Sequence, residues 1–131
     1  MPRAVTTFLM FEGRAEEAMN LYVSLFKGAA ITQIERYGPG ESGAEGSVKL
    51  AAFTLGGHNL ACSDSAVQHA FTFTPSISLF VDCEDAAELA AAFERLSDGG
   101  AVLMALDDYG FSTRFGWVND RFGVSWQLNL R

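Results

Sequence analysis

The sequence predicts an α+β domain made of two tandem βαβββ modules. The pattern of one strand, one helix and three strands occurs twice within 131 residues. A shift of 70 residues places Thr6 on Ser76 and the first predicted helix on the second. A shift of 64 residues superposes the two final hairpins, with Gly56-Gly57 falling on Asp120-Arg121. A duplicated unit of this length cannot bury its sheet face alone, so we expect both modules to fold within one domain.

The first half begins with a strand over residues 5–11, which is rich in β-branched and aromatic side chains. Apolar residues at helical spacing then predict a helix over about residues 14–27, with Gly28 as its stop. Strands are expected over residues 31–37, 48–55 and 58–63. The last two form a hairpin, because Gly56-Gly57 between them is a typical two-residue turn.

The second half repeats this order. It begins with a strand over residues 76–81, followed by a helix over about residues 84–97. Asp82 is the expected N-cap, with Asp85 three residues later as in a capping box. A strand over residues 101–106 and a hairpin around a turn at 119–123 complete it. The predicted boundaries are a single domain over 1–131, modules over 1–64 and 76–131, and a linker over 65–75, interrupted by the β-rich stretch 71–74.

Composition limits the function classes. Hydrophobic residues make up 49% and charged residues 19%, as in ordinary globular domains. The net charge of -7 and the lack of any Lys/Arg run argue against nucleic acid or an anionic membrane as a partner. We expect a cytoplasmic protein, since the chain shows no signal peptide and no apolar run long enough to span a membrane. Cys62 and Cys83 are expected to be free, buried thiols, with a disulfide or a nucleophile as the alternative.

Two motifs suggest a nucleotide site and a metal site, but their sequence context argues against both. Residues 38–43 match G-x-G-x-x-G, but a strand pattern follows them instead of the helix that a dinucleotide site requires. We therefore interpret this stretch as a hairpin loop. His58 and His69 are 11 residues apart, with no carboxylate at metal-ligand spacing, and are interpreted as loop residues.

Three long stretches resemble a known family. They are TTFLMFEGRAEEAMNLY, IERYGPGESGAEGSVKLAAFTLGG and FGWVNDRFGVSWQL. Together with the doubled module they resemble the vicinal oxygen chelate superfamily, which includes glyoxalase I, extradiol dioxygenases and bleomycin-resistance proteins. Within it they look like the PhnB-like branch, whose members often carry the name 3-demethylubiquinone 3-methyltransferase. The resemblance implies a mixed, curved sheet in each module, a cup formed by the two modules, and a homodimer.

The resemblance also places the superfamily's metal-binding positions. In metal-dependent relatives the ligands are typically His and Glu from the first and last strands of each module. Carried over to this chain, those positions hold neutral side chains, so we expect no metal and no cofactor, because divalent cations need imidazole, carboxylate or thiolate donors. The four residues are Thr6, Ser63, Ser76 and Gln127.

Strand alternation adds neighbours to these positions and gives a candidate small-molecule site. Phe8 joins Thr6, Ser78 joins Ser76, and Ser125 joins Gln127. Alternatively, these side chains only pack a closed barrel or a dimer seam.

Pairing in the last hairpin is expected to place Arg114 opposite Gln127 on this face, with Trp117 and Trp126 on the other face. Arg114 would then either form an ion pair or anchor an anionic ligand. The aspartates considered as its partners are Asp107, Asp108 and Asp64.

Three functions remain open at this point. The favoured one is a metal-free module that binds a small amphipathic molecule. The alternative is an enzyme of the superfamily, a lyase, dioxygenase or methyltransferase-like protein acting on a small hydrophobic or anionic substrate. It would use Asp64 as a general base or bind a metal through an unusual ligand set. A methyltransferase that uses S-adenosylmethionine is disfavoured, because the sequence offers no nucleotide site.

Overall fold

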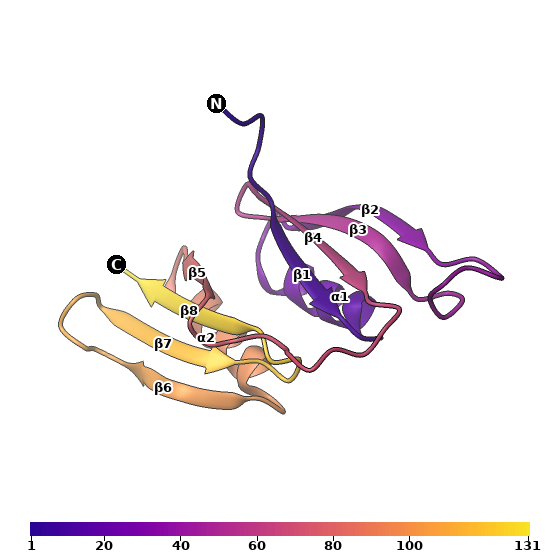
Figure 1. Ribbon diagram of the computed structural model, residues 1–131. Coiled ribbons are helices and arrows are strands. Elements are labelled where there is room, and N and C mark those ends of the chain that lie inside the picture. The colour runs from indigo at the N-terminus through magenta and orange to yellow at the C-terminus, as the bar shows by residue number, and fades with distance from the viewer. The chain divides into compact units, whose positions relative to one another are not determined.

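The computed structural model describes residues 1–131, which divide into two compact units, Met1–His69 and Ala70–Arg131 (Figure 1). The first unit contains β1 (Thr7–Phe11), α1 (Ala15–Leu25), β2 (Ala30–Arg36), β3 (Val48–Leu55) and β4 (His58–Asp64). Its four strands form one sheet in the order β1-β4-β3-β2. β1 runs parallel to β4, while the other two pairs are antiparallel, so the sheet is mixed.

The second unit repeats this topology. It contains β5 (Ser78–Asp82), α2 (Ala86–Ser97), β6 (Ala101–Asp107), β7 (Arg114–Asn119) and β8 (Ser125–Leu130). The strand order is β5-β8-β7-β6, again with one parallel pair, β5 and β8. In Figure 1 each sheet has one helix of its own unit packed against it. The two βαβββ modules predicted from the sequence are therefore confirmed.

The predicted helices and strands lie within one or two residues of the observed bounds, with a few local differences. β5 begins at Ser78, so Ser76 precedes the strand. Residues 71–74 form no strand, despite their β-rich composition. The N-cap of α2 is Asp85, whose side chain accepts a hydrogen bond from the amide of Glu88. The expectation of Asp82 at this position was wrong, since Asp82 is still part of β5.

The pairing of the first and last strands is the same in both units. Leu9 is opposite Cys62 in the first unit, and Leu79 is opposite Trp126 in the second. These pairs are related by the shifts of 70 and 64 residues that the sequence predicted. The conserved pairing matters for the site, because equivalent positions on these strands face the same side of each sheet.

Each unit has its own core between the sheet and its helix. In the first unit, Met19 and Tyr22 of α1 are buried with Phe53 and Leu60 of the sheet. In the second, the core includes Leu89 and Leu96 of α2 with Val118, Trp126 and Leu128. One face of each sheet is thereby covered by the helix of its own unit, and the opposite face, here called the helix-free face, carries no helix of that unit.

Neither helix is long and apolar enough to cross a membrane.

Candidate functional site

The helix-free face of the second sheet combines hydrogen-bonding and aromatic side chains. Its orientation is fixed by Gly116 of β7, where an added Cβ would lie 2.5 Å from the ring of Phe93 on α2. Gly116 therefore faces the helix, and its neighbours Phe115 and Trp117 face the other way. Strand pairing extends the helix-free face across the sheet. Its members include Ser78 and Phe80 of β5, Ser125, Gln127 and Asn129 of β8, and Phe115, Trp117 and Asn119 of β7.

The expected position of Arg114 was wrong. Arg114 is opposite Leu130, and the residue opposite Gln127 is Trp117. Because Arg114 and Gly116 are two residues apart on β7, Arg114 belongs to the helix-side face, where it is exposed. Trp117, which was expected beside Trp126, instead lies on the same face as Gln127. An anionic ligand bound on the helix-free face would therefore not be held there by Arg114.

A chain of hydrogen bonds crosses this face from β7 to β5. Trp117 Nε1 donates to Ser125 Oγ at 2.8 Å, and the hydroxyls of Ser125 and Ser78 lie 2.7 Å apart. Gln127 Nε2 donates to Ser78 Oγ at 3.1 Å. Ser125 is only 1% exposed, so its proton needs a protein acceptor, and Ser78 Oγ supplies one. With that direction, the hydroxyl proton of the half-buried Ser78 and the Oε1 atom of Gln127 remain unused.

Aromatic rings lie next to this chain. The ring of Phe115 packs 5.0 Å from Phe111 and 6.2 Å from Phe80, between ring centroids, and 6.1 Å from Tyr109. Phe115 is buried, while Phe80 is 55% exposed and Phe111 is 63% exposed. Exposed aromatic rings beside a few polar groups are typical of sites for small molecules.

Charged groups stand at one end of the same face. Asp82 Oδ1 accepts a hydrogen bond of 2.8 Å from Asn129 Nδ2, and its Oδ2 accepts one of 3.0 Å from Arg131. The Asn129 hydrogen bond, followed by the Arg131 guanidinium, holds the pKa of Asp82 below its ordinary value. An open hollow of about 480 Å³ lies beside Arg131 and is lined by loop residues that include Asp108, Phe111 and Thr113.

The corresponding face of the first sheet is less polar. Phe8 is 54% exposed and lies opposite Ala61, and Met10 lies opposite Ser63. Thr6 precedes β1 and is exposed, as Ser76 is in the second unit. The predicted residues Phe8 and Ser63 therefore share one sheet face, without a hydrogen-bond chain like that of the second unit.

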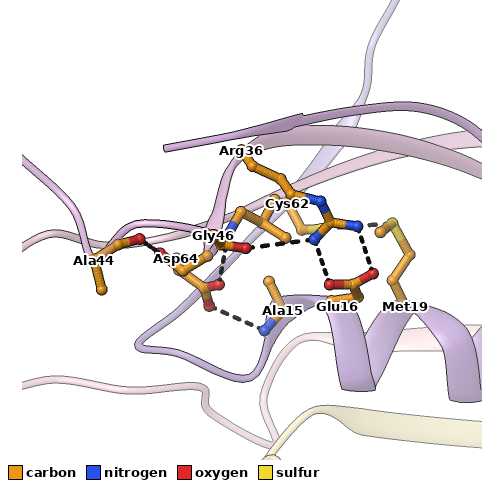
Figure 2. A network of polar contacts seen from close by, with 10 residues as sticks. Ala15, Glu16, Met19, Arg36, Ala44, Gly46, Cys62 and Asp64 are labelled. Atoms are coloured by element: carbon orange, nitrogen blue, oxygen red, sulfur yellow. Dashed lines mark hydrogen bonds and ion pairs between the residues drawn. The ribbon is translucent and has the colours of Figure 1, made fainter. Parts of the chain in front are cut away.

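Asp64, the candidate general base, has a structural role. It is 3% exposed at the end of β4. Its Oδ1 accepts hydrogen bonds from the amides of Gly13 and Ala15, at 2.8 and 2.9 Å, and its Oδ2 accepts one from Val48 at 3.0 Å. Figure 2 shows the carboxylate beside Ala15 at the start of α1. Asp64 thus caps α1 from a neighbouring strand, and both of its oxygens are occupied.

The remaining polar contacts in Figure 2 belong to the surface and core of the first unit. Arg36 holds Glu16 of α1 through two hydrogen bonds, and Cys62 lies against Met19 with 3.9 Å between the sulfur atoms. The two histidines contact separate hydroxyls, His58 that of Thr7 and His69 that of Ser65. His69 lies in a loop, as predicted, whereas His58 is the first residue of β4 and its contact joins β4 to β1, so its interpretation as a loop residue was wrong.

The doubled module defines the class of the protein. Solved structures with the same architecture include the fosfomycin resistance protein FosX from Listeria monocytogenes, in complex with Mn(II) and 1S,2S-dihydroxypropylphosphonic acid. That chain is 11% identical, with a TM-score of 0.63 and coverage of 98% of this chain and 93% of the other, and it shows the fold alone. The fold is that of the vicinal oxygen chelate superfamily.

The family follows from closer matches. Residues 3–129 match the profile of the 3-demethylubiquinone-9 3-methyltransferase family, and the chain belongs to this PhnB-like family. The PhnB protein from Bacillus cereus is 53% identical, with a TM-score of 0.95 and coverage of 98% of this chain and 100% of the other. A protein from Pseudomonas aeruginosa is 25% identical, with a TM-score of 0.84 and coverage of 99% and 98%. No curated protein matches the chain.

The residues present do not fit the divalent metal that the superfamily implies. The four mapped positions, Thr6, Ser63, Ser76 and Gln127, offer three hydroxyls and an amide. The amide nitrogen of Gln127 is already bonded to Ser78. No group of three or more His, Cys, Asp or Glu side chains lies close enough together to hold a metal ion.

The family's name implies S-adenosylmethionine, but the glycine-rich stretch of this chain does not form a nucleotide-binding loop. The loop at residues 38–43 leads from β2 into its antiparallel neighbour β3, as predicted, and opens no helix. Its amides are used locally, since Gly38 donates to the carboxylate of Glu41.

Sequence reasoning missed several residues of the helix-free face. Trp117 was placed on the wrong side, and the site did not include Asn129, Phe115, Phe111 or Tyr109, whereas strand alternation had already placed Phe80 on this face with Ser78. Alternation from Ser125 and Gln127 points to Asn129, so that signal was present in the sequence. The ring contacts of Tyr109 and Phe111 depend on how the loop between β6 and β7 folds back, which no periodic pattern indicates.

Proposed function

We propose that this PhnB-like chain is a small-molecule-binding module that works without a bound metal ion, with its ligand on the helix-free face of the second sheet. The observation that carries the proposal is the hydrogen-bond chain of Trp117, Ser125, Ser78 and Gln127 next to the exposed ring of Phe80. Such a surface offers polar groups of fixed orientation beside an apolar area, which suits an amphipathic ligand. Ser76, ahead of β5, is proposed as an additional contact in the second unit. Phe8 and Ser63, with Thr6 ahead of β1, are proposed as ligand-binding residues on the helix-free face of the first unit.

The alternative is an enzyme, as the family's methyltransferase description suggests. Nothing in the arrangement favours it over binding. Asp64 is occupied as a helix cap, and the mapped metal positions hold weak ligands. A reaction would need a group to accept or donate a proton beside the ligand. The four residues of the chain supply an indole, two hydroxyls and an amide, and the carboxylate of Asp82 at the end of the face is held by Asn129 and Arg131.

Thermal stability with and without candidate ligands tests the proposal. We expect 2-naphthol, a small amphipathic probe, to raise the melting temperature in a concentration-dependent way, because a ligand that binds only the folded state stabilises it by mass action. Phe80→Ala should reduce the shift, and Phe71→Ala, which removes another exposed ring, should not. Elemental analysis and parallel scans with Zn(II), Mn(II), Ni(II) and S-adenosylmethionine test the alternative. A stoichiometric metal, or stabilisation by S-adenosylmethionine, would refute the metal-free binding module.

We further propose a cytoplasmic homodimer. β2 and β6 are sheet edges in their own units, and each unit exposes large apolar side chains such as Phe8 and Phe80. A second copy of the chain would cover such surfaces through a symmetric contact. Both cysteines are free, which suits a reducing compartment. Light scattering at micromolar concentration should give about twice the chain mass of 14.2 kDa, and the chain mass itself would contradict the dimer.

A further inference from the structure

We propose that the ligand of the helix-free face carries a hydrogen-bond-donating head group, such as a hydroxyl, on an aromatic body. This inference rests on the proposed binding function and specifies the chemistry of the ligand. The acceptors are the side-chain oxygens of Asn129 and Gln127, two residues apart on β8 and on the same face of the sheet. Alternate residues of a strand lie about 7 Å apart, so a single hydroxyl bonds one of the two oxygens, that of Gln127 beside Ser78, and the oxygen of Asn129 would take a second donor of the ligand.

The Asn129 amide has a defined orientation and an unused oxygen. Its Nδ2 donates to Asp82 on β5, and a carboxylate that is held by Arg131 can only accept there. The Oδ1 atom is therefore not engaged by Asp82, and on the other neighbouring strand, β7, the residue opposite Asn129 is Phe115. Asn129 is 6% exposed, and its Oδ1 is buried without any hydrogen-bond partner. Burying an acceptor without a donor destabilises the folded state, and a ligand that donates to it would remove that cost.

The same face holds a second buried acceptor without a partner. This atom is Oδ1 of Asn119, which lies at the opposite end of the face, opposite Ser125. Gln127 adds a third unused acceptor, because its Nε2 is bonded to Ser78 while its Oε1 accepts no hydrogen bond. The unpaired oxygens thus lie along one side of the sheet, and a ligand that could only accept hydrogen bonds would leave all three unpaired.

The aromatic side chains and Ser78 determine the rest of the head group. Phe80 is opposite Gln127 on β5, and Phe115 is opposite Asn129 on β7, so an aromatic body can pack between the two acceptors. The free proton of Ser78 points to a head group that accepts as well as donates, as a hydroxyl does. A carboxylate as the ligand's head group would lack the donor. It would also be repelled, because residues 70–131 contain nine Asp and Glu but only four Arg.

A matched pair of probes tests the inference. 2-Naphthol and 2-methoxynaphthalene share the aromatic body and the acceptor oxygen, and only the first can donate. Titration calorimetry should show roughly tenfold tighter binding of 2-naphthol, the ratio expected from one net hydrogen bond. 2-Naphthoate, an anion without a donor, should bind no better than the methoxy compound.

Substitutions connect this ratio to the acceptor of the hydroxyl proton. Gln127→Leu should bring the ratio of the two affinities towards one, because 2-naphthol has a single proton to donate and Gln127 Oε1 lies beside the Ser78 hydroxyl. The exposed control Gln68→Leu should preserve the ratio. Equal binding of the two probes to the unmodified protein would overturn the inference and leave the binding function standing. Absence of binding by all three probes would overturn both.

Discussion

Trp117 and Ser125 are joined by a hydrogen bond of 2.8 Å, with the indole Nε1 as donor and the buried hydroxyl oxygen as acceptor. The two residues lie on adjacent antiparallel strands, on the sheet face opposite α2. This bond links the aromatic side of the candidate site to its polar side, because Ser125 also contacts Ser78. The contact therefore supports both the stability of the sheet and the arrangement of the proposed binding surface.

The first prediction concerns this bond. Ser125→Ala should lower the free energy of unfolding by about 1–3 kcal/mol, because the Trp117 N–H is left without its acceptor. Trp117→Phe should lower the free energy of unfolding less in the Ser125→Ala variant than in the unmodified protein, because it removes the N–H that Ser125→Ala leaves unpaired. Urea unfolding of both single variants and of the double variant, followed by circular dichroism, measures the coupling. Strictly additive losses would mean that the hydrogen bond contributes nothing.

The second prediction concerns the cap of α1. Asp64→Asn should lower the free energy of unfolding by about 1.5–3 kcal/mol. An asparagine oxygen can still accept from Gly13 and Ala15, but its NH₂ group would face the amide of Val48, donor against donor. Asp98→Asn, an exposed substitution at the C-cap of α2, is the matched control and should stay within about 0.5 kcal/mol. Equal stability of both variants would show that Asp64 is no cap.

The sequence was sufficient to predict the fold because the signals were repeated and periodic. Both helices and all eight strands followed from apolar spacing and glycine turns, and the two shifts relate the observed pair Leu9 and Cys62 to the pair Leu79 and Trp126. These features rest on local patterns that the packing of each sheet against its helix reinforces. The metal-ligand positions were carried over from the family's pattern and stay a prediction.

The error at Arg114 has a specific cause. The first hairpin has two residues between the paired Leu55 and His58, whereas residues 120–124 separate the paired Asn119 and Ser125. The prediction assumed turns of equal length, so the predicted pairing of β7 with β8 was shifted by three residues. A shift by an odd number of residues places every side chain of β7 on the opposite face of the sheet. Asp120 stabilises the longer turn, because its Oδ1 accepts from the amides of Phe122 and Val124. Composition identified the turn residues but did not reveal the length of the loop.

The third prediction concerns pH. The hydrogen bond from Asn129, with the Arg131 guanidinium, lowers the pKa of Asp82. A carboxyl whose pKa is lower when folded stabilises the fold above its ordinary pKa, and this contribution disappears as pH falls through the lowered value. Titration of the carboxyl carbon by NMR should show this low pKa, and Arg131→Gln should raise it. Arg95→Gln, on α2, should leave it unchanged, and an unchanged pKa in Arg131→Gln would contradict the part assigned to the guanidinium, whose hydrogen bond lowers the pKa less than that of Asn129 does.

The fourth prediction concerns the thiols. Burial raises the pKa of Cys62 and of Cys83, in each case to about 11. At pH 8 only about one such thiol in a thousand is ionised, and the thiolate is the reactive form. A disulfide reagent that releases a coloured thiol should therefore label the native protein very slowly and both cysteines rapidly in urea. Rapid labelling of the native protein would identify an accessible, activated cysteine and revive the nucleophile alternative.

The last prediction tests the orientation of β7, on which the candidate site depends. Gly116 faces α2, and a Cβ there would lie 2.5 Å from Phe93 and 2.8 Å from Leu106. Gly116→Ala should lower the free energy of unfolding by about 1–3 kcal/mol, because a packed core accommodates an added methyl group poorly. Gly38→Ala is the control, since its Cβ would meet only the flexible carboxylate of Glu41 at 3.2 Å. If Gly116→Ala were as stable as the unmodified protein, Gly116 would face away from the helix, and Arg114 would return to the candidate site in place of Trp117.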